Sequence, residues 1–331
     1  MQSLVMRGLP MRGLLMRGPV LRRVGAAMLL GLGITLSTAA GAADISGFRF
    51  HIVTGDDSGV TRTIAEDMYK RLNPIAVSYR NELAQRRHMV YVAIGPAALR
   101  EVVARKCACV IISVFTSRQV WQTVMAEAPL ARATSITAIY AEPAPADQLR
   151  LVRLLYRRSV RVAAIVSTSS NTGSGSSSSG GPSRRDDGDL SAQLGNEVAL
   201  EPLAPGADIN GVLNRIANVQ VLLATPDSTV YNTESLRNIL LSTYRHKQGV
   251  IGFSADMVRA GALATTYSDI EDVSDQVADM VTHLVETGSL PAPQYPRYFS
   301  SIVNEGVARS LDVEVSEAAR TFAHHSRRRT P

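Results

Sequence analysis

Cysteine is scarce in this chain of 331 residues, and both cysteines, Cys107 and Cys109, lie in one short segment. A small scaffold held together by several disulfides is therefore excluded, and the fold must rest on a large apolar core. If the two cysteines lie on a strand, their side chains point to the same face, and a disulfide between them would be strained. We therefore expect two small buried hydrophobic side chains rather than a bond or a metal site.

Several motifs of nucleotide and metal chemistry are also missing. The sequence contains no G-x-x-x-x-G-K-S/T, no ordered G-x-G-x-x-G after a strand and no H-E-x-x-H. The sequence therefore lacks the usual signatures of P-loop nucleotide binding and of hydrolysis by a zinc ion held on a helix. We expect neither a cofactor nor a metal. Aromatic residues make up only 5% of the chain, against a hydrophobic content of 45%.

The positive charge is concentrated at one end. Five arginines and no acidic residue precede Ala43, so the formal net charge of +6 falls to +1 for the remainder. A nucleic-acid-binding surface is therefore not expected.

Residues 1–43 are typical of a secretory signal. A basic region extends to Arg23, the apolar stretch 24–36 is too short to span a bilayer, and Ala40-Gly41-Ala42 fits the cleavage rule. We expect a periplasmic protein that begins near Asp44. A later start at Met16, a twin-arginine route and an uncleaved anchor helix remain alternatives. No other apolar run approaches the 18 residues of a transmembrane helix.

After the leader, short apolar runs alternate with helical patterns, which predicts α/β architecture with parallel sheets. In the first half the expected strands are 48–54, 76–79, 89–94, 110–115 and 135–140. The expected helices between them are 61–72, 97–104 and about 118–126.

The pattern starts again after residue 145. Here the expected strands are 161–166, 197–200, 219–225 and 249–253, with helices at 146–155, 209–217 and 269–286. The Ser/Gly-rich segment 172–189 predicts a flexible loop, with a phosphate cradle as the alternative. Residues 316–331 end in a histidine- and arginine-rich run, which predicts a disordered basic tail.

Four segments of the last third resemble the substrate-binding proteins of ABC transporters that have the type I periplasmic-binding-protein fold. The matching segments are LLATPDSTVYN (222–232), GVIGFSADMVRAGALATTYSD (249–269), QVADMVTHL (276–284) and YPRYFSSIVNEGVARSL (295–311). The similarity is to the group with tryptophan- and tyrosine-transport-like members. The first 220 residues agree mainly in layout, and the segment 172–189 departs from the usual pattern.

The resemblance implies two Rossmann-like lobes joined by three crossovers, with a small molecule bound between them. Lobe 1 would comprise 44–140 and 266–294, and lobe 2 would comprise 141–265 and 295–315. The crossovers would lie near 140–144, 264–268 and 293–298. The resemblance also implies a monomer that is not an enzyme and delivers its solute to an ABC permease in the membrane.

Ligands of such folds lie at the carboxyl ends of the strands, so polar residues at those positions are the candidate contacts. The candidates are Asp57, Ser58, Gly95, Pro96, Thr116, Ser117, Tyr140, Glu142, Asp227, Ser228, Tyr231, Phe253 and Ser254. Asp227 suits a ligand amine, and Tyr231 or Phe253 suits an apolar ring. For each there is a structural alternative, such as a helix cap for Asp227 and Ser228 or a turn for Gly95-Pro96.

Two other functions stay open at this point. Ser254 follows a strand as a hydrolase nucleophile would, but Asp256 stands where the nucleophile elbow needs glycine. A sensor or accessory protein that keeps the binding fold without transport is the second alternative.

Overall fold

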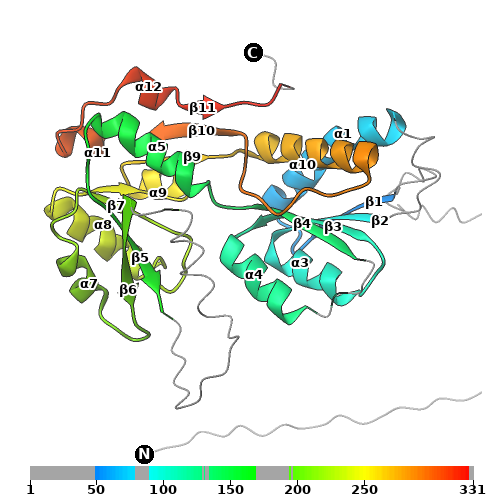
Figure 1. Cartoon of the computed structure of the whole chain (residues 1–331), viewed down its shortest axis with the longest axis horizontal. Helices are drawn as coiled ribbons and strands as arrows, with labels where there is room; N and C mark the ends of the chain where they lie inside the picture. The colour runs from blue at the N-terminus through cyan, green and yellow to red at the C-terminus, as the bar shows by residue number, and fades with distance from the viewer. Residues whose placement is uncertain are drawn as a thin grey trace, which may run out of the picture. The chain divides into compact units, whose positions relative to one another are not determined.

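Two β-sheets organise the described part of the chain, as the computed structural model shows (Figure 1). The structure describes residues 49–78, 89–128, 130, 134–168, 194 and 197–327. The expected signal at 1–43, the loop at 172–189 and the last four residues of the expected tail lie outside the described residues.

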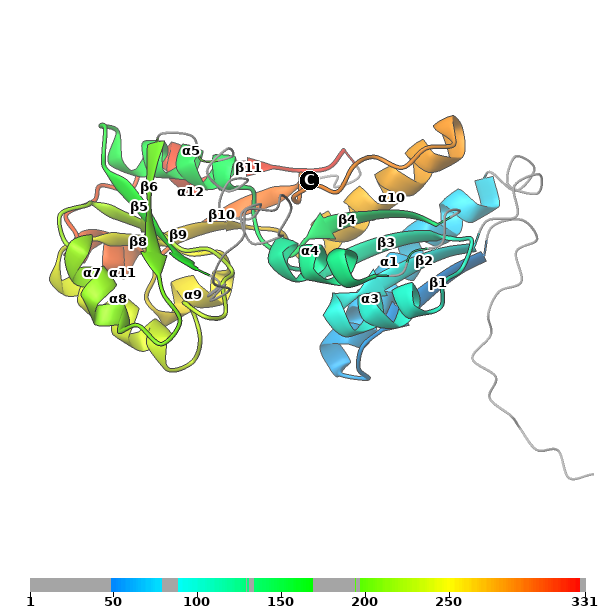
Figure 2. The ribbon, with the colours of Figure 1, turned by 60° about the horizontal axis from the view of Figure 1, so that its bottom comes forward.

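The first sheet is parallel and contains four strands in the order β1-β2-β3-β4. These are β1 (Arg49–Thr54), β2 (Met89–Ile94), β3 (Val110–Thr116) and β4 (Ser135–Tyr140). They run side by side in Figure 2. Along β2, Val90 and Val92 point to one apolar core, whereas Tyr91 and Ala93 point to the other. The alternation therefore places helices on both faces of this sheet.

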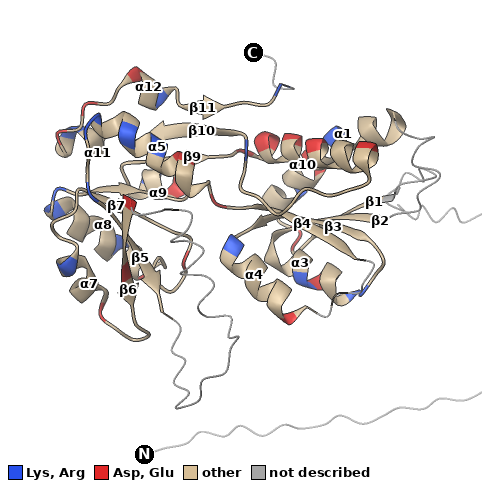
Figure 3. Ribbon diagram, viewed as in Figure 1, with Lys and Arg blue, Asp and Glu red and all other residues tan. Residues whose placement is uncertain are grey.

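One face of the first sheet is covered by α1 (Gly59–Ser78) and α10 (Ile270–Thr287), and the other by α3 (Gly95–Ala104) and α4 (Arg118–Glu127). Several positions of α10 are acidic, and Figure 3 colours its ribbon red at these positions. Arg71 of α1 pairs with Asp67 at 3.1 Å, with Glu271 at 3.4 Å and with Asp275 of α10. The pairs with Glu271 and Asp275 join α1 to a helix that lies some 200 residues later in the chain.

The expected strand at 76–79 is wrong, because α1 continues through this segment to Ser78. Met68, Leu72, Ile75 and Ala76 are buried along the helix, so the apolar residues follow a helical spacing rather than an alternating one. The short apolar run after Pro74 was too brief to distinguish the two patterns.

The second sheet contains seven strands in the order β11-β10-β9-β8-β7-β5-β6. Its strands are β5 (Val162–Ser167), β6 (Val198–Leu203), β7 (Val221–Leu223), β8 (Gly249–Ile251), β9 (Ala264–Tyr267), β10 (Phe299–Val303) and β11 (Ala323–His324). The first five are mutually parallel, whereas β10 is antiparallel to both β9 and β11. The second sheet is therefore mixed, where the sequence predicted a parallel one.

Helices also cover both faces of the second sheet. One core contains side chains of α5 (Pro145–Tyr156), α11 (Glu305–Ser310) and α12 (Glu317–Arg320). The other contains side chains of α7 (Ile209–Arg215), α8 (Ser235–Arg245) and α9 (Ala255–Ala260). The described helices include none that is long and apolar enough to cross a membrane.

The chain passes from one sheet to the other three times. It leaves β4 for α5 through 141–144, leaves β9 for α10 through 268–269, and returns to β10 through 288–298. The return segment pairs with β4, because Tyr140 donates a backbone hydrogen bond of 3.0 Å to Gln294. The expected crossing at 264–268 begins too early: Ala264, Thr265 and Thr266 are fully buried in β9 and belong to the second sheet.

The expected disordered tail at 316–331 is wrong for its described part. Ser316 caps α12 and donates to the Leu154 carbonyl at 3.1 Å, and β11 pairs with β10. Phe322 packs against Phe299 at 5.2 Å between ring centroids, and the buried Ser326 donates to Asp275 of α10. Because this segment is rich in basic residues, the sequence prediction missed the apolar contacts that hold it in place.

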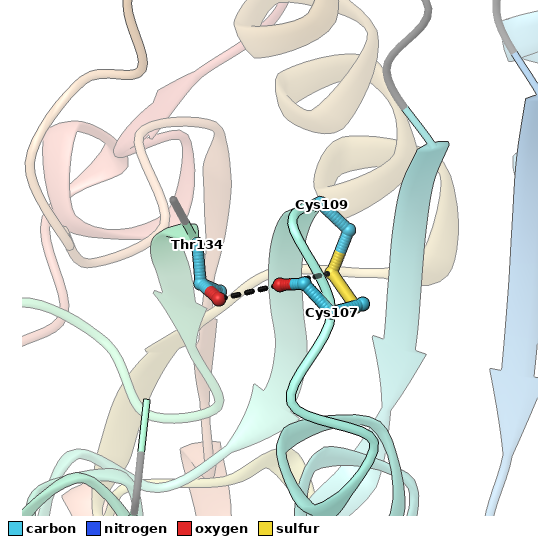
Figure 4. The surroundings of a disulfide bond; sticks show 3 residues. All are labelled: Cys107, Cys109 and Thr134. Atoms are coloured by element: carbon cyan, nitrogen blue, oxygen red, sulfur yellow. Dashed lines mark hydrogen bonds between the residues drawn. A yellow bond between two sulfur atoms is a disulfide. The ribbon is translucent and has the colours of Figure 1, made fainter. Parts of the chain in front are cut away.

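The two cysteines form a disulfide, contrary to the expectation of two separate thiols (Figure 4). Cys107 and Cys109 lie in the bend before β3 and not on the strand itself. Their Cα atoms are 5.2 Å apart, within the range that a disulfide spans. Thr134 donates a hydrogen bond of 2.6 Å to the Cys107 carbonyl, which ties the bend to the chain just before β4.

Candidate functional site

A cavity of about 140 Å³ is lined by residues that follow, or end, five strands of the fold. The segments after β3 and β4 supply Arg118, Gln119, Gln122, Glu142, Pro143, Pro145 and Gln148. The end of β5 supplies Val166 and Ser167, and the end of β7 with the turn after it supplies Leu223, Ala224, Thr225, Pro226 and Asp227. Phe253 comes from the turn after β8, and Leu194 completes the wall. The carboxyl ends of parallel strands are the usual place for a ligand in α/β folds.

Glu142 is the most unusual group of this cavity. Its side chain is only 6% exposed, and Oε1 accepts a hydrogen bond of 2.8 Å from the backbone amide of Arg118, the first residue of α4. Its second oxygen, Oε2, is buried and has no hydrogen-bond partner among the described residues. Burial raises the pKa of Glu142. The backbone amides of Arg118 and of Glu142 itself, together with the Arg118 guanidinium, only partly oppose this rise. A buried carboxylate oxygen without a partner is costly, which points to a group supplied from outside the chain.

The crossing segment on which Glu142 lies is rich in proline and follows a buried tyrosine. Pro143 lies within the segment, Pro145 begins α5, and the side chain of Tyr140 is buried at the end of β4. Tyr140 contacts Trp121 and Tyr295 edge to face, at 5.9 and 5.1 Å between ring centroids. Burial also raises the pKa of Tyr140, against the opposing effect of Arg118.

Asp227 has a different environment in the same cavity. Its Oδ2 accepts from the backbone amide of Ser167 at 2.9 Å, and its Oδ1 accepts from that of Thr229 at 2.9 Å. The carboxylate therefore joins the end of β5 to the turn after β7. The role expected from the sequence, pairing with a ligand amine, would have to be shared with this structural one.

Gln148 of α5 forms one side of the cavity and is 3% exposed. Its amide nitrogen donates to the Gly252 carbonyl at 2.9 Å and to Thr265 Oγ1 at 3.0 Å, and its amide oxygen accepts from the Thr266 backbone at 3.1 Å. These bonds fix α5 against the segment after β8 and against β9. Nearby, Thr225 Oγ1 is buried and unpaired among the described residues.

The structure brings only three of the predicted contacts, Glu142, Asp227 and Phe253, to the cavity wall. Three others immediately precede wall residues or lie against them in space. Thr116 and Ser117 come before Arg118, and Tyr231 packs against Phe253 at 6.0 Å between ring centroids. Burial raises the pKa of Tyr231, whose hydroxyl is unpaired among the described residues.

The remaining predicted contacts lie off the cavity wall and have local structural roles or stay exposed. Ser58 and Ser254, like Ser117, accept hydrogen bonds from the backbone of the helices that they precede. Gly95 has a φ of +82°, which favours glycine at the start of α3. Exposed positions outside the wall are Asp57, Pro96 and Ser228.

The polar wall residues that the sequence prediction missed fall into two groups. Ser167 ends β5 and Thr225 lies two residues beyond β7, so the strand-end rule alone could have identified them. Arg118, Gln119, Gln122 and Gln148 lie within helices, and no one-dimensional pattern marks them. The described residues contain no group of three metal-ligating side chains.

Solved structures were compared with the chain. A ligand-free, open substrate-binding protein with adhesive properties from Clostridium difficile is 12% identical and gives a TM-score of 0.55, with 83% of this chain and 98% of that chain covered. A Streptococcus pneumonia ABC domain in complex with L-Trp is 13% identical, with a TM-score of 0.49 over the same shares of both chains. A conserved domain protein from Vibrio cholerae is 16% identical, with a TM-score of 0.48 over the same shares.

No family model and no curated protein sequence matches the chain. At these low identities the structural likeness concerns the fold. Together with the two α/β sheets and the three passages of the chain between them, it shows that the chain has the type I periplasmic-binding-protein fold.

Proposed function

We propose that this chain is an exported solute-binding protein, which holds a small molecule in the cavity beside Glu142 for an ABC importer. The observation that carries the proposal is the buried Oε2 of Glu142, which faces no partner among the described residues. The fold supports the same function, because strand ends in such folds form ligand sites. No covalent chemistry is needed for it.

The proposal includes a domain organisation. The leader 1–43 would be removed, lobe 1 would hold β1 to β4 with α10, and lobe 2 would hold α5 to β9 with the segment from β10 onward. Relative to the expectation from sequence, the second boundary moves from residue 265 to residue 267, the end of β9. The mature protein would act as a periplasmic monomer.

A thermal-shift screen tests solute binding. The purified protein is heated with amino acids, aromatic acids, small organic anions and small amines, each far above an expected micromolar Kd. A ligand at about 100 times its Kd adds about 2.7 kcal/mol to the free energy of unfolding, which a shift in Tm reports. Titration calorimetry on each positive compound then gives Kd and stoichiometry. A screen without a single shift would contradict the proposed function.

A further inference from the structure

The described charges around the cavity do not balance. Among the residues that the structure describes, its wall contains one cation, Arg118, and two carboxylates, Glu142 and Asp227. All three side chains are at least nine-tenths buried, at 9%, 6% and 8% exposure. Counted formally, the wall carries one negative charge that water reaches poorly. One positive charge from a ligand would neutralise it, whereas an anion would double it.

The two carboxylates are not equally available to a ligand. Both oxygens of Asp227 already accept backbone amides, from Ser167 and from Thr229. Of the Glu142 oxygens, Oε1 accepts from the Arg118 amide, whereas Oε2 has no hydrogen-bond partner among the described residues. A ligand cation would therefore be placed at Glu142, whereas the sequence had suggested Asp227.

From this arrangement we infer that the cavity selects a small molecule with a single cationic amine, and that Glu142 Oε2 is the group that recognises it. The inference rests on the proposed function and specifies the ligand class of the same site. An ammonium group donates hydrogen bonds and supplies the missing charge at once. Because burial favours the neutral carboxyl of Glu142, a bound cation is also what would keep this carboxylate ionised.

The other walls describe the rest of the ligand. Val166, Leu194, Leu223 and Phe253 are apolar, and Thr225 offers one buried hydroxyl that is unpaired among the described residues. A dry apolar cavity of about 150 Å³ is large enough for benzene. With a volume of about 140 Å³, this cavity fits a compact apolar group of similar size attached to the amine.

Probes that share one frame and differ in charge test the inference. Titration calorimetry at pH 7 compares benzylamine, benzyl alcohol, benzoate and phenylglycine. It also compares butylamine, butanol and butyrate, which form the same series on a butyl frame. We expect an amine to bind at least about tenfold more tightly than the matching alcohol, as a hydrogen bond to a charged group allows, and benzoate and butyrate to bind more weakly still.

The variant Glu142→Gln keeps the shape of the side chain and removes its charge. It should lose the preference for amine over alcohol, while Glu127→Gln, the same change at the exposed end of α4, should retain it. Circular dichroism establishes that each variant is folded. If Glu142→Gln does not fold, Glu142→Asp replaces it; this variant keeps the charge, and we expect weaker amine binding with the preference over alcohol retained.

The outcomes separate this inference from the proposed function. Binding of the carboxylates or of phenylglycine without a preference for amines would overturn the inference and leave solute binding intact. An amine preference that survives in Glu142→Gln would overturn the role of Glu142. If both amines fail to bind, the inference also falls, whereas the proposed function falls only if the whole screen is silent.

Discussion

Glu142 and Asp227 are two carboxylates in one cavity whose partners give them different roles. Asp227 is paired on both oxygens with backbone amides and holds two strand ends together. Glu142 is paired on one oxygen and buried on the other. A buried polar group that lacks a partner destabilises the empty protein, and this is the usual arrangement in sites where a ligand completes the hydrogen bonding.

The variant Glu142→Gln should stabilise the ligand-free protein at neutral pH. Burial raises the pKa of Glu142 above its ordinary 4.5, so the folded state holds the proton more strongly than the unfolded state does. The stabilisation that this provides is complete at low pH and is lost as pH rises through the folded pKa. The advantage of glutamine over glutamate should therefore grow from pH 4 to pH 8.

Urea unfolding across this pH range measures that difference. Arg118 and Tyr140 are the charged and titratable groups whose electrostatic effects couple to Glu142. The exposed substitution Glu127→Gln is the control and should show no such trend. A difference between Glu142→Gln and the parent protein that is the same at pH 4 and pH 8 would contradict the explanation.

The variant Asp227→Asn should destabilise the fold, even though it changes only one oxygen to nitrogen. The new NH₂ group would meet one of two backbone amides, so one donor would lose its acceptor. We expect a loss of about 1–3 kcal/mol in the free energy of unfolding. Asp256→Asn removes an equally sized charge at an exposed position and should cost less than about 0.5 kcal/mol. Equal losses in the two variants would disprove the structural role of Asp227.

At the level of secondary structure, the sequence predicted elements well where an apolar pattern was long. Strands β2, β3 and β4 lie where continuous apolar runs predicted them, because strands covered on both faces are apolar throughout. The errors concern short segments. The run at 76–79 belongs to α1, and β9 contains Thr265 and Thr266, whose hydroxyls made a buried strand resemble a linker.

The cavity was less predictable than the elements around it. Strand ends can be located in a sequence, and this is why Glu142, Asp227 and Phe253 were among the candidates. Gln148 lies on a helix one turn beyond its first residue, and Arg118 follows a helix cap. Their approach to the cavity depends on how helices pack, which spacing along the chain does not encode.

The disulfide between Cys107 and Cys109 should contribute little to stability. It closes a loop of three residues, so the chain-entropy model gives a stabilisation of only about 1–2 kcal/mol. Mass spectrometry of the non-reduced protein after alkylation should find no free thiol, and reduction should expose two. The double substitution of both cysteines by serine should lower Tm by no more than a few degrees. A collapse of the fold on reduction would contradict this estimate of a minor role.

At the scale of the whole molecule, the charge distribution separates the leader from the rest. The five arginines before Ala43 account for most of the net charge of +6. The described part of the chain begins at residue 49, and the helices of its two sheets carry both signs of charge (Figure 3). Export would therefore convert a basic precursor into a nearly neutral protein.

Expression of the full chain in a Gram-negative host should give a processed product. We expect the periplasmic fraction to contain a protein with its N-terminus near Asp44, and isoelectric focusing should show a lower pI than the value of about 9.5 for the whole chain. Replacing the apolar residues of 24–36 by serine should keep the precursor intact in the cytoplasm. An unprocessed protein in the membrane fraction would instead support an anchor helix.

The hydrogen bonds of Gln148 link α5 to β9. Helix α5 follows the first passage between the sheets, and β9 precedes the second. If one sheet turned relative to the other, both anchors would turn together, and the rotation would be confined to 141–144, 268–269 and the return segment. Glu142 stands in the first of these strips, between Tyr140 and Pro143. A molecule bound by Glu142 would thus contact a segment about which the sheets rotate, and its binding would limit the extent of that rotation.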